Sequence, residues 1–117
     1  MQDQTLLRVG VLRAVLHVPA SRSLKDRRQV VVSLRDRIRA RFDVSCHEID
    51  TLDLPGRSEL VVTTAGRDAT VVRSVLDKII AFMHSHGTCT VGDVIADVLD
   101  WSGAESAYGR WREDQDV

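Results

Sequence analysis

The segment from Leu6 to Val18 alternates between two kinds of side chain, and this pattern restricts the folds that the chain can adopt. One set of alternate positions carries no charge: Leu12, Ala14, Leu16 and Val18. The intervening positions are mixed: Val11, Arg13, Val15 and His17. A period of two is typical of a strand in a sheet that is covered on one side only. Pro19 is expected to end the strand, because proline cannot donate to a sheet ladder.

A helical pattern follows this strand. Ser23 is expected to be the N-cap, with Asp26 three residues later as a variant of the capping box. The helix is predicted to continue to about Arg41. Its apolar residues fall three or four positions apart and predict one buried stripe: Leu24, Val31, Leu34, Ile38 and Phe42. Basic residues flank that stripe, with Arg28, Arg35 and Arg39 along one edge and Arg27, Arg37 and Arg41 along the other.

The rest of the chain predicts three more strands and one more helix. Strands are expected at residues 43–50, 59–64 and 89–99, with a turn at 54–57. A second helix should start at Asp68 or Thr70 and end with Gly87 as its C-cap. The apolar side of that helix is expected to contain Val71, Val72, Val75, Leu76, Ile79, Ile80 and Met83.

This order of elements predicts an α+β fold. Two interleaved βαβ units with right-handed crossovers give a ferredoxin-like βαββαβ sandwich, a four-stranded antiparallel sheet with two helices on one face. The first and third strands should be central. Residues 1–101 are predicted to form a single domain, and residues 102–117 a polar C-terminal tail that packs partly through its aromatic side chains. With two separated cysteines and no signal peptide or membrane span, we expect a cytoplasmic protein.

Charge is distributed unevenly along the chain. Residues 22–41 contain eight basic and two acidic residues, a net charge of +6, whereas the remainder carries a net charge of −7. This polarity suggests an anionic partner at one end of the molecule. The first hypothesis is therefore a non-enzymatic protein that binds structured RNA or a ribosomal particle through phosphate contacts. The candidate nucleic-acid-binding residues are Ser21, Arg22, Ser23, Lys25, Arg27, Arg28, Arg35 and Arg39. The alternative is a solvated helix whose arginines cover the core or pair with acids.

The open face of the predicted sheet supports a hypothesis of a different class. Its central strands carry no aromatic side chain on which a base could stack, which argues against RNA recognition by this face. Its apolar residues instead suggest a homo-oligomeric interaction, or a domain that senses a small ligand. The candidate oligomer interface contains Val11, Val15, Val61, Ile95 and Leu99. We expect Arg13 to pair across strands with Asp93 or Asp97, and any dimer to be insensitive to salt.

Catalytic and metal sites are not predicted. The chain has no glycine-rich phosphate loop, no nucleophile elbow and no nucleophile–histidine pair that the fold would bring together. Cys46 and Cys89 should lie at opposite edges of the sheet, too far apart to share a metal with the neighbouring histidines. The carboxylates of Glu48, Asp50 and Asp53 could bind a hard cation, but protection of a sheet edge is the favoured explanation. No enzyme activity, cofactor or membrane partner is expected.

The most specific block of the chain is Ser21-Arg22-Ser23-Leu24-Lys25-Asp26-Arg27-Arg28. Residues 6–99, which contain this block, resemble the YlxP-like family, a bacterial family of unknown function. Other matching blocks are Gly10-Val11-Leu12-Arg13, Leu16-His17-Val18-Pro19 and Arg41-Phe42-Asp43-Val44-Ser45. The resemblance implies a ferredoxin-like fold. Because such proteins are often encoded beside translation and ribosome-maturation factors, it also implies a role near the ribosome.

Overall fold

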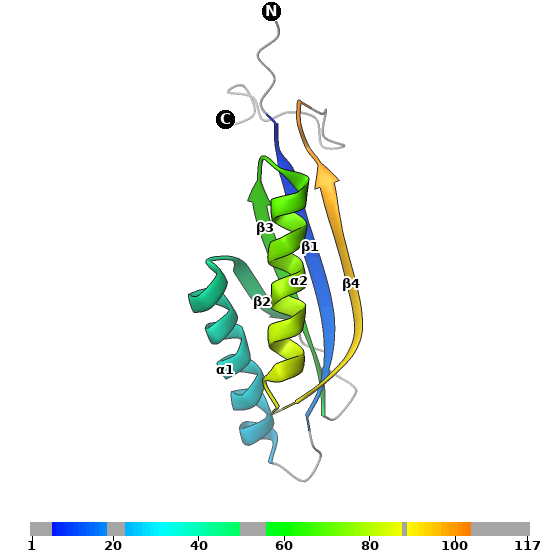
Figure 1. The fold of residues 1–117 in the computed structure, drawn as a ribbon. Coiled ribbons are helices and arrows are strands. Elements are labelled where there is room, and N and C mark those ends of the chain that lie inside the picture. The colour runs from blue at the N-terminus through cyan, green and yellow to red at the C-terminus, as the bar shows by residue number, and fades with distance from the viewer. Residues whose placement is uncertain (1–5, 19–22, 50–55, 88, 104–117) are drawn as a thin grey trace, which may run out of the picture.

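A computed structural model of the chain describes residues 6–18, 23–49, 56–87 and 89–103. Its elements are β1 (Arg8–His17), α1 (Leu24–Phe42), β2 (Ser45–Ile49), β3 (Arg57–Gly66), α2 (Ala69–Ser85) and β4 (Thr90–Asp100). The strands form one antiparallel sheet in the order β2-β3-β1-β4 (Figure 1). The predicted ferredoxin-like βαββαβ fold, with the first and third strands in the centre, is confirmed.

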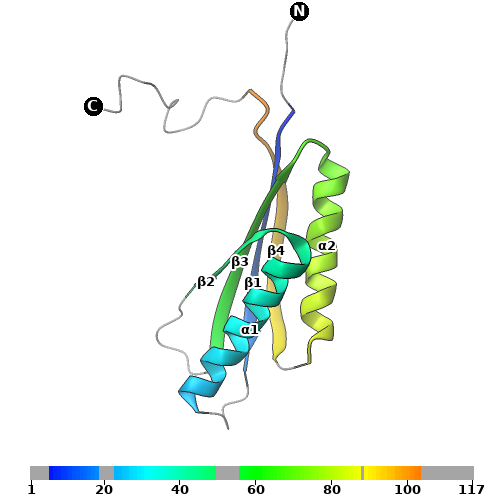
Figure 2. The ribbon, with the colours of Figure 1, turned by 90° about the vertical axis from the view of Figure 1, so that its left-hand side faces the viewer.

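Both helices cover the same face of the sheet (Figure 2). The core lies between these two layers because the strands turn their uncharged positions toward the helices. The largest fully buried side chains are Leu12, Leu16, Leu34, Ile38, Leu60, Leu76, Ile79, Met83, Val31, Val62 and Cys46. The alternation in the sequence therefore predicted the buried face of β1 correctly.

Helix α1 begins and ends through side-chain and backbone capping. The Ser23 hydroxyl accepts a hydrogen bond from the backbone N–H of Asp26 at 3.1 Å, which confirms Ser23 as the N-cap. At the other end, Asp43 adopts the left-handed conformation with φ 53° and donates its N–H to the Arg39 carbonyl at 3.2 Å. Aspartate tolerates this conformation better than most residues do. Asp43 thus closes the helix, and β2 starts later than the sequence indicated.

Helix α2 begins where the sequence predicted, with Asp68 as its N-cap. The Asp68 carboxylate accepts hydrogen bonds from the N–H groups of Thr70 and Val71. The prediction that Val71 belongs to the buried side is wrong, since it is 59% exposed. The stripe against the sheet is narrower and consists of Val72, Leu76, Ile79 and Met83. Val71 lies about 100° around the helix axis from Val72, and at that angle its side chain faces solvent.

Glycines on two neighbouring strands allow α2 to approach the sheet closely. A Cβ atom at Gly10 of β1 would lie 2.7 Å from Val72 Cγ1, and one at Gly66 of β3 would lie 3.0 Å from Val72 Cγ2. Both distances are shorter than ordinary carbon contacts of about 3.5–4.0 Å. The absence of side chains at these positions therefore leaves the space that Val72 occupies.

The two ends of β1 are tied to distant parts of the chain. Val18 donates its N–H to the carbonyl of Gly56 at 2.7 Å, and Gly56 has φ +75°, a conformation that favours glycine. At the other end, Trp101 donates its N–H to the Leu7 carbonyl at 2.9 Å, and the Ser102 hydroxyl accepts from the Leu7 N–H at 2.8 Å. These contacts join β4 to the start of β1.

Some predicted features lie outside the described residues. They are Ser21, Arg22, Asp50, Asp53 and the predicted tail beyond Gly103.

Candidate nucleic-acid interface

Helix α1 concentrates the basic charge at one side of the molecule. It carries seven basic and two acidic residues, a net charge of +5, and it packs beside the edge strand β2. The opposite edge strand, β4, contains Asp93, Asp97 and Asp100 and no basic residue. Figure 1 shows α1 and β4 on opposite sides of the fold. The charge polarity of the sequence is therefore also a polarity in space, with α1 as the positive side.

Two of the predicted binding arginines are engaged on the β2 side of α1. Arg35 forms an ion pair with Asp36 at 3.0 Å, and Arg39 lies 3.9 Å from the same carboxylate. Arg39 also donates from Nε to the Cys46 carbonyl of β2 at 2.8 Å. This hydrogen bond fastens the helix to the edge strand. Arg35 and Arg39 thus already have acceptors within the chain, which makes them less available to a phosphate than their sequence positions suggested.

The arginines on the other edge of α1 face α2. Arg37 lies 3.2 Å from the His86 ring, and the guanidinium of Arg41 stands 5.3 Å from the centre of the Phe82 ring. Burial, aided by the positive charge of Arg37, lowers the pKa of His86. These contacts hold the two antiparallel helices together through cation–π and polar interactions. They also confirm that basic residues flank both edges of the buried stripe.

The first two turns of α1 carry the most available positive charge. Lys25 and Arg28 are exposed, and neither forms an ion pair with another described residue. Arg27 is half-buried beside them. The Ser23 hydroxyl already accepts from Asp26, so its role here is to cap the helix. Predicted contacts by Ser21 and Arg22 lie outside the described residues. Among the predicted binding residues that the structure describes, Lys25 and Arg28 are therefore the exposed bases without an ion pair to another described residue.

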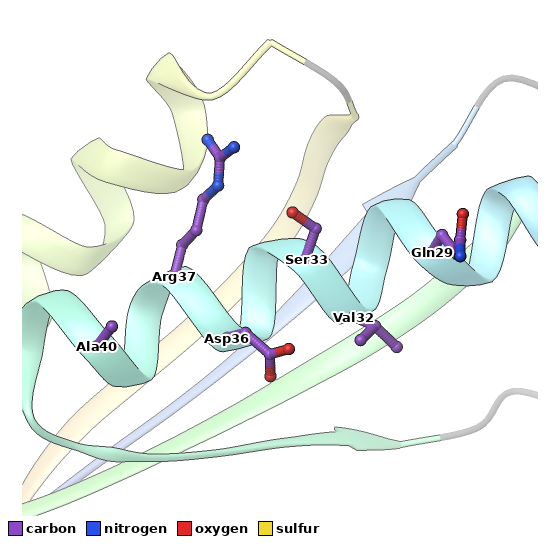
Figure 3. Close-up of a pocket in the computed structure, with 6 residues that line it drawn as sticks. All are labelled: Gln29, Val32, Ser33, Asp36, Arg37 and Ala40. Carbon is purple, nitrogen blue, oxygen red and sulfur yellow. The ribbon is translucent and has the colours of Figure 1, made fainter.

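A shallow hollow runs along the outward face of α1 (Figure 3). Its lining consists of Gln29, Val32, Ser33, Asp36, Arg37 and Ala40. Arg37 points toward the end of α2, whereas Asp36 points the other way (Figure 3). Because one acid and one base line this open surface, it offers no concentrated positive charge of its own. We therefore treat it as part of the helix surface and not as a ligand pocket.

The open face of the sheet contains the candidate oligomer interface. Ile95 is 69% exposed and Leu99 is 40% exposed, while Val11, Val15 and Val61 are half-buried. All five lie on strands whose other face packs against the helices. The structure thus brings the predicted apolar residues together on one surface.

The predicted pairing of Arg13 with Asp93 or Asp97 is wrong. Arg13 instead donates from Nε to the carboxylate of Glu59 on β3, and Arg57 Nη2 lies 3.7 Å from the same carboxylate. Arg13 stands opposite Val61 on β3 and Ile95 on β4, so Glu59 lies at a position diagonal to it, as Asp97 does. Glu59 is only 3% exposed although it lies on the open face. Sequence analysis missed this cluster, since only the strand register brings Arg13 of β1 near Glu59 of β3. Arg57 lies two residues before Glu59 on the same strand.

The cluster of Arg13, Arg57 and Glu59 makes the stability of the fold depend on pH. The hydrogen bond from Arg13 holds the pKa of Glu59 below its ordinary value, against the opposing effect of burial. A lowered folded-state pKa means that the stabilisation is present above the unfolded pKa of about 4.3 and is lost as the pH falls through the folded pKa. We expect the Tm of Glu59→Gln to be lower than that of the unaltered chain at neutral pH, and the two values to converge in acid. A constant difference in Tm across a pH series would contradict this.

The cysteines and histidines do not assemble into a metal site in the described residues. Cys46 lies in β2 and Cys89 lies beside β4, so the two thiols are at opposite edges of the sheet as predicted. Burial raises the pKa of Cys46 to about 11, which keeps it a thiol. Within the described ranges, no three His, Cys, Asp or Glu side chains converge. Glu48 accepts a hydrogen bond from Ser58 at 3.1 Å.

The family of this chain follows from its sequence. Residues 9–95 match the model of the DUF503 family, described as proteins of unknown function. The chain belongs to the DUF503 family. The match spans α1 and α2 and ends within β4, so it includes the arginine-bearing helix and most of the sheet. No curated protein matches the chain.

Two solved structures are similar to this DUF503 member. One is titled "De novo designed protein Foldit4", with 13% identity and a TM-score of 0.44 over 80% of this chain and 96% of that one. The other is titled "Structural Genomics, protein YJCS", with 9% identity and a TM-score of 0.46 over 76% of this chain and 96% of that one. In the described part of the chain, neither helix is long and apolar enough to cross a membrane.

Proposed function

We propose that this protein is a non-enzymatic binding protein that contacts the phosphate backbone of structured RNA, as free RNA or in a ribosomal particle in the cytoplasm. The observation that carries the proposal is the positive surface at the start of α1, at the side of the fold opposite the acidic strand β4. Lys25 and Arg28 are exposed there and form no ion pair with the described residues. Such groups can exchange counterions for phosphates without first breaking a contact within the protein.

The arrangement favours backbone contact over recognition of base sequence. No Phe, Tyr or Trp side chain lies on the open face of the sheet in β1, β3 or β4, which argues against a platform for stacking single-stranded bases there. Guanidinium and ammonium groups on a rigid helix instead suit the regular phosphates of a duplex. A YlxP-like identity within the DUF503 family, with its implied proximity to translation factors, would agree with a ribosomal RNA partner.

The test is a salt titration of binding to ribosomal subunits and to a generic RNA duplex. We expect binding to weaken log-linearly with salt. For Lys25→Glu with Arg28→Glu, the slope of log affinity against log salt should become shallower by about 2, since each lost phosphate contact contributes about 0.9. A preference for the subunit over the duplex would favour a ribosomal partner.

The matched control reverses two exposed bases on the other helix, Arg73→Glu with Lys78→Glu. This control makes the same change in net charge and should retain the slope of the unaltered chain. Reversal of Arg35 should have a smaller effect than reversal of Arg28, because Arg35 is paired with Asp36. No binding at low salt, or equal losses in the two double variants, would refute the proposal.

A further inference from the structure

The open face of the sheet contains four neighbouring positions with a diagonal pattern. The register places Val11 beside Asp97 and Arg13 beside Ile95 on the same face of β1 and β4. The apolar residues therefore occupy one diagonal of this quartet, and the charged residues occupy the other. From this pattern we infer that the open face binds a second copy of the chain through a two-fold symmetric contact.

The pattern is self-complementary. A two-fold axis that runs between two such faces, along the apolar diagonal, brings Val11 against its own copy and Ile95 against its own copy. The same rotation exchanges the charged corners, so that Arg13 of each chain meets Asp97 of the other. Because the axis is oblique to the strands, the two sheets cross steeply, toward the orthogonal class of sheet packing.

The side chains of the quartet are available for this contact. Ile95 is 69% exposed, and burial in a second copy would remove this large apolar surface from water. Arg13 uses Nε to bind Glu59, but its side chain remains 57% exposed and its terminal amino groups can donate to a second acid. Asp97 is exposed, and its carboxylate accepts a hydrogen bond from the Val98 N–H at 2.8 Å.

The pairing of Arg13 with Glu59 lowers the electrostatic cost of burying Arg13 in this contact. A buried arginine is costly unless its donors are satisfied. In the dimer, Arg13 would bridge its own Glu59 and Asp97 of the second copy, so that neither acid nor base is buried alone. The helices lie on the other face of the sheet, so a dimer leaves the start of α1 accessible. This inference therefore does not depend on the proposed RNA binding.

The first test measures the mass of the full chain in solution by analytical ultracentrifugation. We expect the unaltered chain to form a dimer and Ile95→Arg to raise its dissociation constant by roughly 100-fold, because two unpaired charges would meet at the axis. Val71→Arg is the matched control, since Val71 is 59% exposed on α2 and should leave the dimer intact. The dimer should persist in high salt, where exposed ion pairs contribute little.

Two further variants test the register of the contact. Asp97→Arg should weaken the dimer, because it places two arginines together, whereas Asp93→Arg makes the same charge change outside the quartet and should not. Ile95→Cys should form a disulfide between copies on mild oxidation, and Val71→Cys should not. A monomeric unaltered chain would overturn the inference, as would a dimer unaffected by Ile95→Arg. If the Ile95→Cys variant is a stable dimer but forms no disulfide on oxidation, the two-fold arrangement described above is overturned.

Discussion

Replacement of Leu34 by alanine is expected to lower the free energy of unfolding by about 2–5 kcal/mol. Leu34 is completely buried and lies in the middle of the stripe by which α1 packs on the sheet. Removal of its terminal carbons forfeits their transfer from water and leaves a cavity that the neighbouring side chains fill only in part. Chemical denaturation monitored by circular dichroism would measure the loss.

A neighbouring position on the same helix provides the control. Ser33 is exposed, so Ser33→Ala should change stability by at most about 0.5 kcal/mol. A small loss for Leu34→Ala, similar to that of the control, would mean that α1 is not anchored by its apolar stripe. This result would also weaken the proposed RNA site, since a rigid α1 is what orders its basic side chains.

The second large effect is expected at Gly10, where valine should reduce stability by about 1–3 kcal/mol through overpacking. An added Cβ atom would lie 2.7 Å from Val72 Cγ1 and 3.2 Å from Leu76 Cδ1. Val72 is branched at Cβ and has little freedom to move aside within the helix. The strain must therefore be relieved by displacement of α2 from the sheet. Thermal and chemical unfolding of the variant would report the loss.

A second substitution should relieve this strain. In the double variant Gly10→Val with Val72→Ala, the two changes should compensate, which gives a favourable coupling energy in a double-mutant cycle. Gly92→Val is the matched control in β4, where the added Cβ would lie 3.0 Å from the exposed His17 ring, which can rotate away. Additive effects of the Gly10 and Val72 substitutions would contradict the close-approach explanation.

Much of the candidate site could be predicted because it depends on local spacing. Basic residues flank the buried stripe of α1 on both edges, as the helical period indicates, and Ser23 caps the helix. Local spacing does not predict which of these basic side chains contact other groups within the protein. Arg39 reaches the Cys46 carbonyl and Arg37 reaches His86 only because α1 docks between β2 and α2. These partners lie 7 and 49 residues away along the chain, where no local pattern connects them.

The sequence by itself determined the order of the elements and the buried face of β1, because side-chain spacing along one segment sets both. Two sequence predictions failed, the burial of Val71 and the start of β2 at Asp43. Both depend on how the helices are packed, because packing decides that Val71 is exposed and that Asp43 caps α1. The tertiary structure alone decided that Arg13 pairs with Glu59 and that Val11, Asp97, Arg13 and Ile95 form a quartet. The physical reason is strand register, which arises from contacts between distant segments and determines which side chains become neighbours.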